Sequence, residues 1–101
     1  MKLEKKPDHF EVLRSIDNNP NITQRELSYK LGFSLGKINY CLNSLKDKGF
    51  IKYKNFKRNR SKINYFYMLT PRGISEKTKL TLDFMRRKAV EYEDLKKEID
   101  K

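Results

Sequence analysis

Residues 22–49 read ITQRELSYKLGFSLGKINYCLNSLKDKG, and this stretch decides the fold. It opens on a capping box, in which the Thr23 hydroxyl accepts a free backbone amide while the Glu26 carboxylate reaches back to the Thr23 amide. Leu27 and Leu31 are four residues apart and share one helix face. Gly32 supplies the left-handed residue that ends such a helix. We therefore expect a short helix over residues 24–31.

A second helix begins almost at once. Ser34 is a favourable N-cap residue, and Gly49 is placed to end the helix. Its apolar residues follow one another at spacings of three and four and predict one buried stripe, made of Leu35, Ile38, Leu42 and Leu45. Two short helices joined by a three-residue turn that contains glycine are typical of the helix-turn-helix motif.

The flanking segments complete the predicted domain. Pro7 suits the first turn of a helix over residues 7–18. After Gly49, apolar and basic residues alternate, which predicts two antiparallel strands over residues 51–54 and 63–69 joined by a basic tip. A hairpin directly after a helix-turn-helix is a wing.

Thr70 and Pro71 predict the start of a last helix that runs to about residue 100 and is about 45 Å long. Its apolar stripe is as narrow as a coiled-coil seam and consists of Leu82, Met85, Ala89, Tyr92, Leu95 and Ile99. We expect a mainly α fold with a small β hairpin. It divides into a winged helix-turn-helix over residues 1–70 and a helix over residues 71–101 that dimerises with a second copy of the chain.

The charge predicts a polyanionic partner for the first two thirds of the chain. The 101 residues contain 24 Lys and Arg but only 13 Asp and Glu, a net charge of +11. Residues 1–70 carry 15 basic and 6 acidic residues, a net charge of +9, whereas residues 71–101 carry 9 and 7, a net charge of +2. The basic residues between 46 and 62 are interleaved with apolar ones, which indicates a structured binding surface rather than a disordered tail.

Several function classes lack the residues that they need. Cys41 is the only cysteine and His9 the only histidine, so neither a disulfide framework nor a zinc site is predicted. The sequence shows no catalytic constellation, and we expect no enzyme activity, metal or cofactor. Its apolar runs are too short to span a bilayer and the first seven residues do not resemble a signal peptide. These features favour a cytoplasmic protein with no membrane partner.

The helix that starts at Ser34 carries the chemistry of a major-groove reader on the face opposite its apolar stripe. Lys donates to guanine acceptors, Asn pairs with adenine, and Tyr contacts a phosphate or a thymine methyl group. A glycine near the helix start lets the backbone approach closely. The residues predicted to enter the major groove are Ser34, Gly36, Lys37, Asn39, Tyr40 and Asn43.

Two further groups are predicted to contact the DNA backbone. Helix N-termini and basic side chains suit phosphates, and here they supply Thr23, Gln24, Arg25 and Lys46. The wing would follow the backbone or enter the minor groove through Lys54, Lys57, Arg58, Asn59, Arg60 and Lys62.

Four segments together resemble the winged helix-turn-helix of the MarR family of transcriptional regulators: ITQREL at 22–27, LGFS at 31–34, LKDKGFI at 45–51 and LTPRG at 69–73. The segments SLGKINYCL at 34–42 and KNFK at 54–57 look more particularly like a short branch of that family associated with exopolysaccharide gene clusters. The resemblance implies a homodimer on a palindromic operator, with the helix after Ser34 in the major groove and the wing beside it.

The chain departs from the family pattern in two ways. Larger members have further helices that build a dimer domain and often a ligand pocket, whereas this chain has one C-terminal helix, which argues against a small-molecule effector. The Asp-x-Arg pattern of the family's wing tip is replaced by basic and polar residues at 57–62. The family's wing contacts therefore do not transfer position by position.

The sequence predicts a homodimeric regulator that binds specific sites in double-stranded DNA, with exopolysaccharide genes as candidate targets. Two alternatives stay open. One is a non-specific architectural or RNA-binding protein, in which Tyr53, Tyr65 and Tyr67 stack on unpaired bases. The other is a protein-interaction module whose basic face meets an acidic partner.

Overall fold

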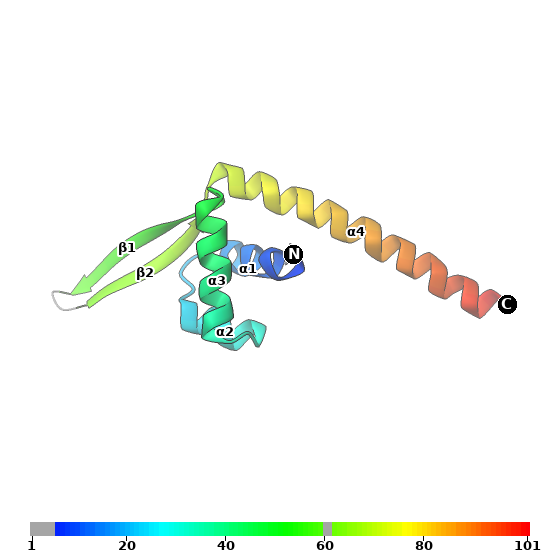
Figure 1. Ribbon diagram of the computed structural model, residues 1–101, viewed down its shortest axis with the longest axis horizontal. Helices are drawn as coiled ribbons and strands as arrows, with labels where there is room; N and C mark the ends of the chain where they lie inside the picture. The colour runs from blue at the N-terminus through cyan, green and yellow to red at the C-terminus, as the bar shows by residue number, and fades with distance from the viewer. Residues whose placement is uncertain (1–5, 60–61) are drawn as a thin grey trace.

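The computed structural model describes residues 6–59 and 62–101. In chain order its elements are α1 (Lys6–Asn18), α2 (Gln24–Leu31), α3 (Leu35–Asp47), β1 (Ile51–Asn59), β2 (Lys62–Leu69) and α4 (Pro71–Asp100). Figure 1 shows α1, α2 and α3 gathered at the centre, the β1–β2 hairpin projecting to one side and α4 running away to the other. The architecture is the predicted mainly α fold with one hairpin and a long final helix. Among the helices of the described chain, none is long and apolar enough to cross a membrane.

The helix-turn-helix has the predicted caps. The Glu26 amide donates to the Thr23 hydroxyl over 3.1 Å, and the Thr23 amide donates to the Glu26 carboxylate over 2.9 Å. Gly32 ends α2 with a left-handed φ of 69°, and Ser34 starts α3 by accepting a bond from the Lys37 amide. Because each cap satisfies backbone groups at a helix end, local sequence alone sets the turn between α2 and α3.

One hydrophobic core lies between α1, α3, the base of the hairpin and the first half of α4. It consists of Phe10, Val12, Leu13, Ile16, Ile22, Leu27, Ile38, Cys41, Leu42, Leu45, Ile51, Tyr67 and Leu80. Three of the four predicted stripe residues of α3 are buried, but Leu35 was wrongly assigned to the core, since it is 45% exposed. Leu35 is the first residue of α3. It shares the helix face of the buried residues, but no other element of the described chain covers that face at this end of the helix. Cys41 instead fills the stripe beside Leu42.

The wing strands are longer than predicted. The antiparallel register pairs Ile51 with Leu69 and Tyr53 with Tyr67 at the base, and it continues to Asn59 and Lys62. Residues 57–59 and Lys62, assigned to the tip from the sequence, therefore lie in β1 and β2. The prediction stopped too early because it followed apolar alternation, whereas the ladder is made by backbone groups and continues through polar residues.

The start of α4 is fixed against the turn between α3 and β1. The Thr70 amide donates to the Phe50 carbonyl over 3.0 Å, and the Thr70 hydroxyl donates to the Gly49 carbonyl over 2.6 Å. A Cβ atom at Gly73 would overlap the Phe50 carbonyl oxygen and lie 2.8 Å from its carbon. Only glycine therefore lets the first turn of α4 reach this position.

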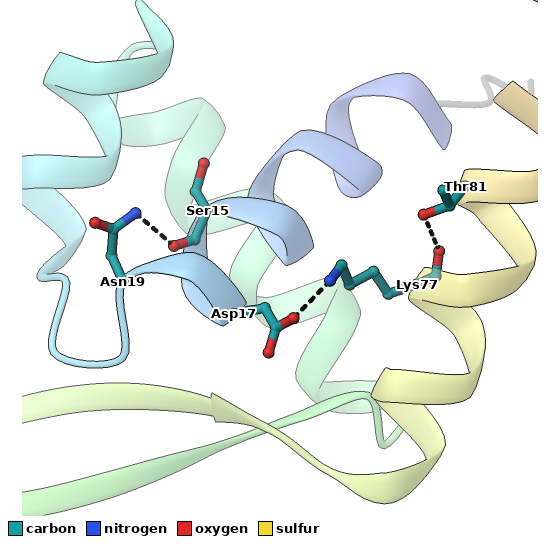
Figure 2. Close-up of polar contacts among 5 residues, drawn as sticks. All are labelled: Ser15, Asp17, Asn19, Lys77 and Thr81. Atoms are coloured by element: carbon teal, nitrogen blue, oxygen red, sulfur yellow. Dashed lines mark hydrogen bonds and ion pairs between the residues drawn. The ribbon is translucent and has the colours of Figure 1, made fainter. Parts of the chain in front are cut away.

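The first half of α4 then packs along α1. Figure 2 shows the Lys77 ammonium reaching the Asp17 carboxylate across the two helices, over 2.5 Å. Leu80, three residues after Lys77, is buried in the core, and the Phe84 ring lies 5.7 Å from the Phe10 ring. From Phe84 to the end of α4 every side chain is exposed. The second half of α4 is thus a single helix without any covering element in this chain.

Gly73→Ala tests the contact between α4 and Phe50. We expect the added methyl group to displace α4 or strain the turn and to lower the free energy of unfolding by about 1–3 kcal/mol, as overpacking does. Urea denaturation followed by circular dichroism measures this change. Gly36→Ala is the matched control, because its nearest neighbour would be the Ser34 hydroxyl at 3.9 Å. The control should be neutral or stabilising by up to about 1 kcal/mol, and an equally stable Gly73→Ala variant would contradict the packing described.

Burial of Tyr67 makes the free energy of unfolding depend on pH in the alkaline range. It is 7% exposed and its ring meets the Tyr53 ring edge-on at 5.1 Å. Burial raises the pKa of Tyr67 above its usual value of 10.0, and Tyr53 adds to the increase. As the pH rises through 10, the unfolded chain therefore loses this proton before the folded one, and the free energy of unfolding falls.

Tyr67→Phe removes this titration, so its stability should decline less steeply above pH 10 than that of the wild type. Tyr40→Phe removes the same hydroxyl group at an exposed position and is the matched control. Denaturation curves taken from pH 8 to pH 11, chosen to bracket the phenol pKa, measure both. Parallel curves for wild type and Tyr67→Phe would show that burial does not perturb Tyr67.

Candidate nucleic-acid interface

The outer face of α3 brings together most of the residues predicted for the major groove. Ile38, Leu42 and Leu45 hold the inner face in the core, so the opposite face points to solvent. The exposed residues on this face are Gly36, Asn39, Tyr40 and Asn43, and Ser34, which is also exposed, precedes them as the N-cap of α3. Tyr40 is 59% exposed, and together with Asn43 it lines a shallow groove that continues to Asp47 and Lys48. This face offers amide and phenol groups for hydrogen bonding, while the buried face fixes the helix.

Lys37 is held apart from this group. Its ammonium lies 3.1 Å from the Asp8 carboxylate of α1 and 4.0 Å above the Phe33 ring. Both side chains of the ion pair are partly exposed, so the pair contributes little stability. Helical periodicity predicts Lys37 on the outer face of α3. Its side chain is flexible, however, and its ammonium pairs with the Asp8 carboxylate of α1 instead.

The predicted phosphate contacts lie along α2 and at the end of α3. Thr23 and Gln24 are half-buried at the start of α2, and Arg25 is exposed in its first turn. The Lys46 ammonium lies 4.8 Å above the Tyr53 ring, which links the end of α3 to the base of the wing.

Tyr29 is a candidate contact that the sequence reasoning missed. It is 93% exposed, the most exposed large hydrophobic side chain among the described residues. It follows Arg25 by four residues and so lies on the same face of α2, opposite buried Leu27. An aromatic residue at this spacing, turned away from the leucine stripe, was the available signal.

The wing is described only near its base. Lys54 is exposed on β1. The side chains of Lys57, Arg58, Asn59 and Lys62, and the whole of Arg60, lie outside the described residues, so their contacts stay predictions. The Tyr65 side chain lies outside them as well. Tyr67 packs into the core rather than on the surface, which makes it part of the fold and not a stacking platform for bases.

The described surface offers hydrogen-bonding and basic groups rather than a catalytic or metal-binding arrangement. Within residues 6–59 and 62–101, no three Asp, Glu, His or Cys side chains cluster in a way that could hold a metal ion. Cys41 is 1% exposed in the core of the domain. Polar groups on one exposed helix, flanked by basic residues on neighbouring elements, form a surface that matches the edges and backbone of a nucleic acid.

Comparisons with known proteins agree with this geometry. Residues 9–52 match the family model described as winged helix-turn-helix DNA-binding. A MarR-family transcription regulator has a similar structure, with a TM-score of 0.73 and 24% identity over 84% of this chain and 55% of that one. No curated protein sequence matches the chain.

Two further solved structures extend this likeness. Streptococcus pneumoniae FabT in complex with DNA has a TM-score of 0.63 and 24% identity, over 89% of this chain and 59% of that one. Staphylococcus aureus MarR in complex with salicylate and kanamycin has a TM-score of 0.68 and 22% identity, over 85% of this chain and 57% of that one. The chain thus spans a little more than half the length of each of these three proteins. It has the winged helix-turn-helix fold of the MarR-family transcription regulators.

Proposed function

We propose that this chain is a transcription regulator that binds specific double-stranded DNA sites as a homodimer. One observation carries the proposal. The outer face of α3 presents Asn39, Tyr40 and Asn43 to solvent, while the inner face of the same helix is anchored in the core. A rigid helix with an exposed row of hydrogen-bonding side chains is the arrangement that a helix-turn-helix protein inserts into the major groove.

The proposed division of roles follows from side-chain chemistry. Asn39 and Asn43 each offer a paired donor and acceptor that match adenine, and a good bidentate pair is worth about 1–3 kcal/mol of discrimination. Tyr40 contacts a thymine methyl group or a phosphate. Lys37 reaches a guanine after its ion pair with Asp8 breaks. Breaking this pair costs little free energy, because both side chains are partly exposed.

Contacts to phosphates then position the domain without reading sequence. We assign this role to Thr23, Gln24, Arg25 and Lys46, and we add Tyr29 because its hydroxyl is free to reach outward from α2. The wing contributes Lys54 and the basic residues of 57–62. FabT, whose structure was solved with DNA, shares this fold and supports DNA as the partner.

Dimerisation is assigned to α4, so that residues 1–70 bind DNA and residues 71–101 join two copies. Leu82, Tyr92 and Ile99 are 47%, 66% and 82% exposed on a helix that this chain leaves uncovered. A lone charged helix is marginal in water unless its apolar face is packed against a partner. A two-fold dimer matches an inverted-repeat operator with half-sites about 34 Å apart, or a multiple of that distance.

We further propose a cytoplasmic role without an enzyme activity, a metal, a cofactor or a small-molecule effector, with exopolysaccharide genes as candidate targets. The solved structures similar to this chain include a MarR-family transcription regulator, which supports a role other than that of an enzyme. The RNA-binding alternative loses one of its three stacking tyrosines, because Tyr67 is buried. The protein-interaction alternative predicts no duplex binding at physiological salt.

The double variant Asn39→Ala, Asn43→Ala tests the assignment of α3 as the reading helix. We expect it to keep its fold, since both residues are exposed, and to lose about tenfold or more of its preference for a specific duplex over a random one. Fluorescence anisotropy with both duplexes measures the ratio. Thr78→Ala, an exposed polar change on α4, should leave that ratio unchanged. Undiminished discrimination by the double variant would contradict the assignment.

A further inference from the structure

We infer that α4 pairs with α4 of a second copy as an antiparallel coiled coil whose two-fold axis passes between Val90 and Glu91. The inference rests on the proposed dimer and gives it a direction and a register. It starts from the heptad pattern of α4, in which positions a and d form the seam between two helices. Position a holds Leu82, Ala89 and Lys96, and position d holds Met85, Tyr92 and Ile99. Leu95, the remaining residue of the apolar stripe, takes position g beside the seam and is 67% exposed.

This seam is separate from the face of α4 that packs inside the chain. The intrachain face is formed by Gly73, Lys77, Leu80 and Phe84, which meet Phe50, α1 and the core. At 3.6 residues per turn, the seam lies about a third of a turn around the helix from this face. Figure 1 shows the second half of α4 extending beyond the rest of the chain. A second copy can therefore cover the seam without displacing α1.

The sizes of the seam residues favour the antiparallel direction. With the axis between residues 90 and 91, Ala89 faces Tyr92 of the partner subunit and Leu82 faces Ile99 of the partner subunit. A small residue opposite a large one keeps two helices at an even separation. In a parallel pair each residue meets its own copy, so two alanines leave a gap beside two crowded tyrosines.

Lys96 also favours the antiparallel pairing of the two helices over the parallel one. In a parallel pair, Lys96 opposes Lys96 of the partner subunit in the seam, and two like charges face each other there. In the antiparallel pair it opposes Met85 of the partner subunit, where its stem packs on the thioether while the ammonium reaches water. The antiparallel direction therefore removes the one charge conflict in the seam.

Charges beside the seam fix the register. In the antiparallel pair, Arg86 lies next to Glu93 of the partner subunit and Lys79 lies next to Asp100 of the partner subunit. Each of these pairs occurs twice because of the two-fold axis. A shift of one heptad in one direction sets Arg86 against its own copy, and a shift in the other direction sets Glu93 against its own copy. Only the central register avoids like charges at these flanking positions.

The charge of the DNA-binding part agrees with this direction. Residues 1–70 carry a net charge of +9 in each copy, from 15 basic and 6 acidic residues. A parallel pair would place both of these basic regions at the same end of the coiled coil, whereas an antiparallel pair places them at opposite ends. Separation weakens their mutual repulsion, which falls with distance and with salt.

A charge swap tests the direction and the register together. Arg86→Glu alone and Glu93→Arg alone each turn two attractive pairs into repulsive ones, and each should raise the dimer dissociation constant roughly tenfold. The double variant Arg86→Glu, Glu93→Arg restores opposite charges and should return the constant close to the wild-type value. Sedimentation equilibrium on the full chain measures the constant, and circular dichroism checks the helix content.

The rescue by the double variant is the decisive result. Arg86 also lies 3.2 Å from Asp83 in its own helix, so the loss in a single variant has a second contribution. That contribution persists in the double variant, and recovery therefore reports the contact between subunits. Arg87→Glu and Asp94→Arg make the same charge changes at exposed positions away from the seam, and they should leave the dissociation constant unchanged.

Three outcomes would overturn the inference. In a parallel dimer, Glu93 would pair with Lys88 of the partner subunit, so only Glu93→Arg would weaken the dimer and Arg86→Glu would not rescue it. A dimer insensitive to every variant would show that α4 pairs through another surface. A wild-type chain that sediments as a monomer would remove the dimer itself, while duplex binding by the monomer, measured by anisotropy, would still report on α3 independently.

Discussion

The backbone of Gly49 and Phe50 is the point on which the arrangement of this molecule depends. The Phe50 amide closes the end of α3 by donating to the Leu45 carbonyl over 2.9 Å. The carbonyl groups of the same two residues accept the amide and the hydroxyl of Thr70, where β2 ends and α4 begins. Gly73 completes the junction, because the absence of a side chain lets α4 rest on Phe50. One short segment thereby joins the end of the candidate reading helix, both strands of the wing and the start of α4.

This junction has a functional consequence. A two-fold regulator can match two half-sites only if each reading helix keeps a fixed orientation toward the dimer axis. Here the path from α3 to α4 runs through main-chain hydrogen bonds and a steric contact rather than through a flexible linker. The Lys77–Asp17 pair and the Phe84–Phe10 contact hold α4 at a second place along α1. The angle between the winged helix-turn-helix and the second half of α4 is therefore set within each chain.

Local signals in the sequence determined most of the fold. The capping box at Thr23, the left-handed Gly32 and the caps at Ser34 and Thr70 lie where predicted, because a cap depends on residues within one helical turn. Contacts between distant segments were harder to foresee. The exposure of Leu35 depends on what covers the end of α3, and the extent of the wing depends on pairing between strands. The need for glycine at position 73 depends on a carbonyl 23 residues earlier in the chain.

In the candidate site, too, local features could be predicted from the sequence, whereas contacts between distant segments could not. Asn39, Tyr40 and Asn43 could be placed on one exposed face from helical periodicity alone. The ion pair between Lys37 and Asp8 could not be predicted in this way, since it involves a side chain of α1 that periodicity does not relate to α3. Tyr29 is not among the predicted contacts, because those on α2 were inferred from its cap and first turn, and Tyr29 lies one turn after Arg25. A surface is predictable from sequence where one element forms it, and less so where several elements meet.

Sequence-specific binding by α3 can be measured by selection of random duplexes with the purified protein at about 150 mM salt, where non-specific phosphate binding is weakened. We expect sequencing of the retained duplexes to recover an inverted repeat, with half-sites related by the two-fold axis of the proposed dimer. Tight binding with no sequence enrichment would contradict this expectation and would favour an architectural or RNA-binding protein instead.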